Sequence, residues 1–359
     1  MCTLLPSTLK PTLAPMSTNP APAPARPFDP AGTYTLALRL VVGWTYFSAF
    51  WRRTALANKL DWDAEGYIGE KFNHFLPHAL GIKPLIEYLV SNPDALWWSM
   101  LAFTMIEGIV GLLLMLGLFT RAMSVAVFGL AMGILLGSGW IGTTCLDEWQ
   151  IGILGLAAGF TLFLSGGGIH SLDRLLAKRG AAITRKAWFP WVASGHLDVF
   201  SGRLFILAPA GAGIILLLSL FTNQVFHGGV WGKLHNKSVK PRVEITDAAL
   251  GTGGLRFTVQ RVEGADVYGS FLIGLDVLDA GGNKVLALTG EDLARFPQEH
   301  IRNAYVAKVK PGKHSMILPL GAKAELHVQA DTLSRLPTGV YRLRLTDISG
   351  SLWEAPIAH

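Results

Sequence analysis

The stretch Gly139–Gly152, GWIGTTCLDEWQIG, is a short segment with polar residues between two long apolar runs, Ala122–Trp140 and Trp149–Leu164. An apolar run of about 20 residues can cross the hydrocarbon core of a bilayer as a helix. The sequence therefore predicts two membrane helices joined here by a hairpin. The hairpin contains Cys145, one of only two cysteines in the chain, close to Asp147 and Glu148.

Composition places the whole chain in the membrane class. Of its 359 residues, 50% are hydrophobic and only 16% are charged, and the mean hydropathy is +0.38. These values are unusual for a soluble protein. Three more apolar runs, Thr33–Trp51, Trp97–Leu118 and Leu204–Val225, bring the predicted membrane helices to five.

Apolar residues are concentrated before residue 226, and the later part of the chain alternates apolar and polar residues. Alternation interrupted by turns, as at Gly281–Asn283 and Pro311–Gly312, is typical of an antiparallel, immunoglobulin-like β-sandwich. The predicted strands include Val243–Thr246, Leu255–Val259, Phe271–Leu278, Glu325–Val328 and Tyr341–Leu345. We expect a tail (1–31), a four-helix membrane domain (32–170), a basic cytoplasmic linker (171–202), a fifth membrane helix (203–228) and a periplasmic β-sandwich (229–359).

Two segments outside the predicted helices have a distinct composition. The first 30 residues contain eight prolines and no unbroken apolar core, which favours a disordered tail over a cleavable signal peptide. The first loop, Arg52–Leu96, is too long for a plain connection and contains apolar stretches. We expect it to form short amphipathic helices over the outer mouth of the bundle.

Basic residues predict the orientation of the helices. Arg121 and the lysines and arginines of the tail and of segment 174–203 fall on one side if five helices alternate across the membrane. The positive-inside rule makes that side cytoplasmic, against a smaller basic group in the first loop. The chain would then be a multi-pass protein of the bacterial inner membrane with a periplasmic C-terminal domain. Its net charge of +6 sets topology on this view, and nucleic acid is not expected as a partner. Interfacial anchors on the outer side would be Trp51, Trp97, Trp98, Trp140 and Trp149.

This topology brings two distant segments to the same outer face. Cys145, Asp147 and Glu148 would meet the basic group Arg52, Arg53 and Lys59. Cationic side chains suit a small oxyanion, and a nearby cation would lower the pKa of the Cys145 thiol and make it more reactive. Each residue also has a structural alternative. The cysteine could be an inert buried side chain, and the arginines could contact lipid headgroups. The two acids are candidate catalytic residues that accept protons, and they could instead cap the following helix.

Two charges lie inside predicted membrane helices, where charges are costly and mark functional candidates. Arg39 lies in the first helix and Glu107 is central in the second. Similar depths in antiparallel helices predict an ion pair between them, and the alternative is that Glu107 handles protons for a quinone.

Metal and nucleotide sites are not predicted. The two cysteines lack metal-ligand spacing, and Pro77 disturbs the helix that would align His74 with His78. Glycine-rich nucleotide motifs and haem-like histidine pairs are absent from the sequence. A redox role would therefore need a diffusible carrier instead of a bound metal, flavin or haem.

The segments Arg39–Trp44, Trp51–Arg53 and Gly139–Trp149 resemble the DoxD family of four-helix membrane proteins. The fifth helix, Gly229–Pro241 and the β-region resemble DoxA. Together they resemble a fused DoxDA thiosulfate:quinone oxidoreductase, whose two subunits are separate chains in some organisms. The resemblance implies oxidation of two thiosulfates to tetrathionate, with two electrons passed to membrane quinone.

This resemblance gives the predicted residues roles. Cys145 would form a transient sulfur–sulfur bond with one thiosulfate, and a second thiosulfate would attack the adduct. The β-region would cap the outer face, and Lys233, His235, Lys237 and Lys240 would either add positive potential or form a solvated linker. Quinone would dock among Trp44, Tyr46, Trp140, Trp149, Glu107 and Arg39.

Two alternatives use the same residues without this chemistry. DoxD-like proteins have also been associated with terminal quinol oxidases, so the chain could be a non-enzymatic accessory subunit. An anion transporter would use the same basic residues to move thiosulfate without redox change. The partners expected in each case are the lipid bilayer and a sulfur oxyanion or quinone, and self-association stays open.

Overall fold

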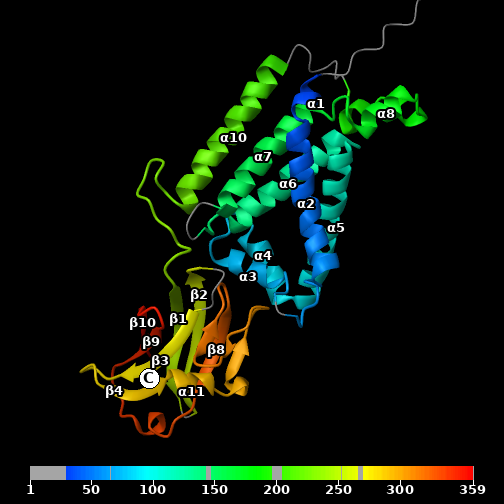
Figure 1. Cartoon of the computed structure of the whole chain (residues 1–359). Helices are drawn as coiled ribbons and strands as arrows, with labels where there is room; N and C mark the ends of the chain where they lie inside the picture. The colour runs from blue at the N-terminus through cyan, green and yellow to red at the C-terminus, as the bar shows by residue number, and fades with distance from the viewer. Residues whose placement is uncertain are drawn as a thin grey trace, which may run out of the picture.

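The computed structural model describes residues 30–64, 66–142, 147–195, 204–251, 253–265 and 270–358. A helical bundle and an all-β domain lie end to end (Figure 1). Short helices α3 and α4 lie between them (Figure 1). The predicted fold class, membrane helices followed by two antiparallel sheets, is confirmed.

The described residues include four helices that are long and apolar enough to cross a membrane. They belong to α5 (Pro93–Leu116), α6 (Thr120–Ser138), α7 (Asp147–Ser165) and α10 (Leu204–Phe226). The first predicted run is also helical, but Thr35 divides it into α1 (Ala31–Tyr34) and α2 (Leu36–Trp51). The Thr35 hydroxyl binds the Ala31 carbonyl oxygen at 3.2 Å and the Ser165 hydroxyl at 2.9 Å. The continuous α2 is therefore 16 residues long, shorter than predicted.

Glycines allow the two helices of the first pair to approach closely. A Cβ atom at Gly111 of α5 would collide with the backbone of Phe47 and the carbonyl oxygen of Gly43 on α2. Helices α6 and α7 form the predicted antiparallel hairpin, and α10 lies against α7. Only 6% of the apolar span of α10 is buried inside the protein, so most of this helix is available to lipid.

Short helices cover both ends of the bundle. The first loop forms a π-helix, η1 (Arg52–Leu56), then α3 (Glu70–Phe75), a 3-10 helix, η2 (Leu76–His78), and α4 (Lys83–Ser91). This confirms the predicted short helices at the β-domain end. The opposite end contains α8 (Leu172–Lys178), η3 (Ala182–Arg185) and α9 (Phe189–Val192).

The β-domain consists of two antiparallel sheets. One has the order β1-β2-β8-β5, and the other has the order β10-β9-β3-β7-β6 with β4 paired to β3. Leu255, Phe257 and Val259 of β2 pack with Leu275 and Leu343 from the second sheet in one buried core. The strands are β1 (Arg242–Gly251), β2 (Gly254–Glu263), β3 (Ser270–Leu278), β4 (Lys284–Thr289), β5 (Ile301–Asn303), β6 (Lys310–Pro311), β7 (Met316–Leu318), β8 (Lys323–Val328), β9 (Tyr341–Asp347) and β10 (Leu352–Ile357). Helix α11 (Gly290–Ala294) and the 3-10 helices η5 (Gln298–His300) and η6 (Leu333–Arg335) connect strands.

The β-domain is fastened to the short helices of the first loop. Asn73 of α3 accepts a hydrogen bond from the Ala307 amide at 3.1 Å, and its backbone lies directly against Gly321. Leu320 enters a buried cluster that includes Leu135 and Trp140 of the bundle. The two halves therefore share packed and hydrogen-bonded surfaces at this seam.

Candidate functional site

A cavity of about 330 Å³ lies inside the bundle at its β-domain end. Its wall is mostly apolar, and four charged residues contribute to it: Arg53, Lys71, Glu107 and Glu148. Helices α3 and α4 cover it, and the rest of the wall comes from η1, α5, α6, α7 and the loop residues Ile68 and Ile82. The other lining residues are Ile68, Phe72, Phe75, Ile82, Leu85, Ile86, Leu89, Met100, Phe103, Gly133, Ile134, Gly137 and Ser138.

Two of the charged residues form an ion pair in this wall. Arg53 of η1 donates a hydrogen bond through Nη1 to Oε2 of Glu107 on α5. The side chains are 18% and 4% exposed, so the pair is largely withdrawn from water. The guanidinium also lies 5.8 Å from the centre of the Phe103 ring, within range of a cation–π interaction. The pair compensates the charge of Glu107 inside a membrane helix.

The predicted ion pair between Arg39 and Glu107 is wrong. Arg39 is buried at the opposite end of the bundle, where its guanidinium donates to the carbonyl oxygens of Gly167 and His170. The cause is helix register, because Gly43 lies against both Gly111 and Met115. This register places the Arg39 guanidinium beside Gly117, about three helical turns from Glu107.

The hairpin itself is only partly described. Cys145 lies outside the described residues, as do its neighbours from 143 to 146. Helix α7 begins at Asp147, which places Asp147 and Glu148 in its first turn, where acids favour the helix dipole. Glu148 also lines the cavity, so both predicted roles for this carboxylate fit its position.

Contacts from the second half of the chain hold both flanks of the hairpin. Before it, the amide of Gly142 donates to the Ser238 hydroxyl at 3.0 Å, and Asn236 donates to the Gly142 carbonyl oxygen at 2.9 Å. After it, the Trp149 indole donates to the Thr222 hydroxyl of α10 at 2.9 Å. The ends of the cysteine segment are thus tied to residues that follow residue 203.

The three predicted oxyanion ligands are not equivalent in the structure. Arg53 lines the cavity, whereas Arg52 is exposed and donates through Nε to the Ser48 carbonyl oxygen of α2 at 3.3 Å. Lys59 is exposed in the loop after η1. Neither Arg52 nor Lys59 lines the cavity. Their binding of substrate remains a prediction.

The four aromatic residues predicted to bind quinone occupy different environments. Trp44 is exposed on α2, and Tyr46 is buried in the bundle. Trp149 is partly buried, and its ring nitrogen is bonded to α10. Trp140 is fully buried, with its indole hydrogen bonded to the Phe75 carbonyl oxygen at 3.2 Å, so its predicted role as an interfacial anchor is wrong. The packing of η2 and Leu320 over it explains the burial.

His78 of η2 lies at the seam with the β-domain. Its ring packs edge-on against Trp140 at 4.9 Å. Burial, followed by the positive charges of Lys237, Arg242 and Lys83, lowers the pKa of His78 to about 4. Glu263 lies 3.6 Å from Nε2 and would favour the protonated form, but its carboxylate is already paired with Arg242 at 3.1 Å. We therefore expect neutral His78 at pH 7.

Sequence reasoning missed the apolar part of the cavity. Phe72 and Phe75 belong to the expected amphipathic helices, but their partners on α5 and α6 could not be assigned without the packing. Gly133 and Gly137 leave room in the wall, since a Cβ at Gly133 would meet no atom within 4 Å. Among the described residues, no group of three His, Cys, Asp or Glu side chains could hold a metal ion.

Comparison with family models gives two matches. Residues 34–200 match the model described as TQO small subunit DoxD. Residues 226–356 match the model described as TQO small subunit DoxA. The first match contains the cavity helices and the cysteine hairpin, and the second begins at the end of α10 and contains the β-domain.

Proposed function

This chain belongs to the DoxD and DoxA families, joined in one polypeptide, and from that premise we propose that it oxidises thiosulfate to tetrathionate and reduces membrane quinone. The observation that carries the proposal is the cavity at the β-domain end of the bundle. It combines an apolar wall with the Arg53–Glu107 pair. One of its lining residues, Glu148, follows Cys145 by three residues in the sequence.

The cavity suits the ring of a quinone. Phe72, Phe75 and Phe103 provide flat apolar contacts, and Arg53 provides a hydrogen-bond donor for a quinone oxygen. Leu85 and Gly133 line the cavity and are exposed. Their exposure supports access from the lipid phase, where membrane quinone dissolves.

The sulfur chemistry is assigned to Cys145. Its thiolate and the sulfane sulfur of one thiosulfate form a sulfur–sulfur bond, which releases two electrons to quinone. The sulfane sulfur of a second thiosulfate then attacks the sulfane sulfur of the adduct and expels the cysteine thiolate. The product is tetrathionate, and the thiolate is regenerated. Cys145 precedes Glu148 by three residues, so chain length alone keeps their Cα atoms within about 11 Å.

Carboxylates at the cavity serve the proton balance. Reduction of a quinone to a quinol takes up two protons together with the two electrons. Glu107 and Glu148 both line the cavity, so either can pass a proton to a quinone oxygen. Arg53 binds Glu107 and orients that carboxylate, while Asp147 is a second acid at the start of α7.

We place the protein in the bacterial inner membrane with its β-domain on the periplasmic side. The distribution of basic residues supports this orientation, since Arg121, Arg174, Lys178 and Arg179 lie at the end of the bundle opposite the β-domain. Arg52 and Lys59 then lie on the periplasmic side, where they attract thiosulfate to the mouth of the site.

Thiosulfate-dependent reduction of a soluble quinone analogue by the purified full chain tests the proposal. Cys145→Ala and Cys145→Ser should abolish turnover, whereas Cys2→Ser, which changes the other cysteine, should not. Wild-type turnover in the Cys145 variants would eliminate the covalent step. Failure of the intact chain to reduce quinone would favour an accessory subunit, and thiosulfate flux into vesicles without redox change would favour a transporter.

A further inference from the structure

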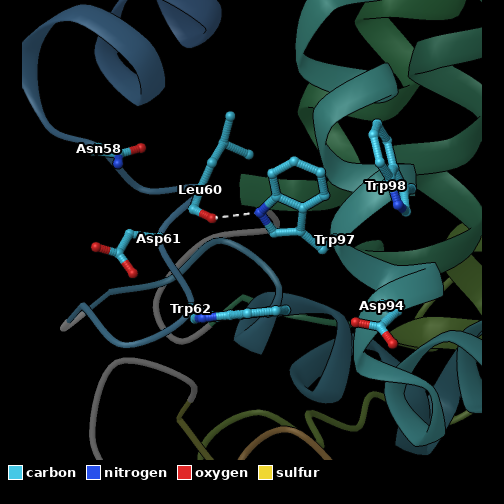
Figure 2. A pocket seen from close by; sticks show the side chains of 7 residues that line it. All are labelled: Asn58, Leu60, Asp61, Trp62, Asp94, Trp97 and Trp98. Atoms are coloured by element: carbon cyan, nitrogen blue, oxygen red, sulfur yellow. Dashed lines mark hydrogen bonds between the residues drawn. The ribbon is translucent and has the colours of Figure 1, made fainter.

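A second cavity, of about 580 Å³, lies beside the N-terminus of α5 (Figure 2). It is formed by the loop after η1 and the first turns of α5. The lining residues are Asn58, Leu60, Asp61, Trp62, Asp94, Trp97 and Trp98. None of them lines the cavity that contains Arg53 and Glu107. The proposed oxidation of thiosulfate therefore leaves this second cavity without a role.

The charge of this cavity is negative. Asp61 and Asp94 are its only ionisable lining side chains among the residues that the structure describes. Asp94 lies in the first turn of α5 and offsets the positive end of that helix dipole. Asp61 then supplies negative charge in excess. Within the described chain, its carboxylate accepts a hydrogen bond from the Asp63 backbone amide at 3.0 Å. A dianion such as thiosulfate would be repelled, and a cation would be attracted.

Three indole rings accompany the two carboxylates. Trp97 is held by a hydrogen bond from its ring nitrogen to the Leu60 carbonyl oxygen at 2.9 Å (Figure 2). Trp62 and Trp98 are 55% and 65% exposed, so their rings are not committed to the protein core. Figure 2 shows Asp61 and Asp94 on opposite sides of the Trp62 indole. Indole faces with nearby carboxylates are the groups that bind ammonium ions.

The position of the cavity suggests where its ligand comes from. Helix α5 can span a membrane from Pro93 to Leu116, so the cavity lies at the level of lipid headgroups. Trp98 also begins a stripe of exposed apolar side chains on one face of α5. Its further members are Met105, Ile109, Leu112 and Leu116. Their spacing of three, four or seven residues keeps them on the same side of the helix.

We propose that this cavity binds the ammonium group of an amine-bearing phospholipid, such as phosphatidylethanolamine, whose acyl chains lie along the α5 stripe. The carboxylates of Asp61 and Asp94 compensate the ammonium charge, and the indoles of Trp62 and Trp97 contact its methylene groups. The Asn58 amide is the polar group available to the adjacent phosphate. A lipid satisfies both the headgroup cavity and the apolar stripe, whereas a soluble amine satisfies only the first.

Native mass spectrometry of the full chain in detergent, with equimolar phosphatidylethanolamine and phosphatidylglycerol, tests this proposal. The wild type should retain the amine lipid at least about fivefold more than the glycerol lipid. Asp61→Asn with Asp94→Asn should remove the preference, and Trp62→Ala should weaken retention about three- to tenfold. The matched control is Asp63→Asn, an exposed acid of the same loop that does not line this cavity.

Three results would overturn the assignment. The first is equal retention of the two lipids by the wild type, and the second is an unchanged preference in the doubly neutralised variant. The third is displacement of the bound lipid by free ethanolamine at the same concentration, which would make the cavity a site for soluble amines. Thermal unfolding of each variant in the same detergent shows that a lost preference does not come from misfolding.

Discussion

The Arg53–Glu107 pair allows the structural and chemical roles of a buried charge to be separated. Removing one member of a buried ion pair costs about 3–5 kcal/mol, because the remaining charge has no partner. Arg53 keeps 18% of its side chain exposed and Glu107 only 4%, so water can partly solvate the arginine. We therefore expect Glu107→Gln to cost about 2 kcal/mol and Arg53→Gln about 3 kcal/mol.

The double variant should cost no more than Arg53→Gln alone, because neither charge is then left without compensation. The double-mutant cycle should give a coupling energy of at least about 2 kcal/mol. Denaturant titration of the detergent-solubilised protein measures each free energy of unfolding. Arg52→Gln is the matched control, and it should cost less than about 0.5 kcal/mol because Arg52 is exposed. A coupling energy below about 0.5 kcal/mol would show that the two charges do not compensate each other.

The same double variant decides whether the pair has a chemical role. If the pair acts on quinone, through a proton from Glu107 or a hydrogen bond from Arg53, the folded double variant should lose at least about 100-fold in thiosulfate-dependent turnover, a loss in the usual range for a proton-transfer group. A folded double variant with turnover within about threefold of wild type would show that the pair only compensates charge. Stability and turnover thus give separate answers from one set of proteins.

Four further predictions concern the cavity and the seam. Gly133→Leu should fill free space and raise the KM for quinone at least about tenfold in steady-state assays, whereas Gly129→Leu, at another glycine with open space, should not. Gly321→Ala should destabilise the seam by about 2 kcal/mol or more, seen as faster proteolysis between the two halves, because its φ of +76° is strained for alanine. Because the unfolded state takes up the His78 proton at a higher pH than the folded state, the seam should lose up to about 3 kcal/mol of stability as pH falls from 6.5 towards the His78 pKa of about 4. Thermal unfolding at several pH values measures this loss, and His78→Gln should reduce the dependence of stability on pH. Ser238→Ala should lower kcat more than it raises the KM for thiosulfate or for quinone, and Ser238→Thr should restore kcat. Equal effects of the two variants on kcat would mean that the hydroxyl does not position the hairpin.

The architecture follows from patterns that depend on local physics. Long apolar runs identified α5, α6, α7 and α10, and alternation identified segments of β1, β2, β3, β8 and β9. The first helix was overestimated because a hydropathy pattern does not show that Thr35 binds Ser165 across the bundle. Strands β5, β6 and β7 have two or three residues each, too few for alternation to be visible.

The site could be predicted only in part, because pairings between helices depend on register. The residue types at the cavity were identified as candidates, including Arg53, Glu107 and Glu148. The partner of Glu107 was misassigned because Arg39 and Glu107 were expected at a similar depth in the membrane and were therefore paired. The close approach at Gly111 instead sets a register of α2 along α5 that keeps them apart. Trp140 was misassigned for a related reason, since the domain that buries it lies far away in the sequence.

The joining of the two halves has a consequence for the cysteine segment. Asn236 and Ser238 hold Gly142 before this segment, and Thr222 holds Trp149 after it. These three residues all lie in or beyond α10, so the part of the chain before α10 lacks the groups that hold the ends of the hairpin. A covalent connection keeps those groups at a high effective concentration, whereas separate chains must first bind each other. We therefore expect the second half to act on the proposed sulfur chemistry through the position of the hairpin, even though it contains no cysteine of its own.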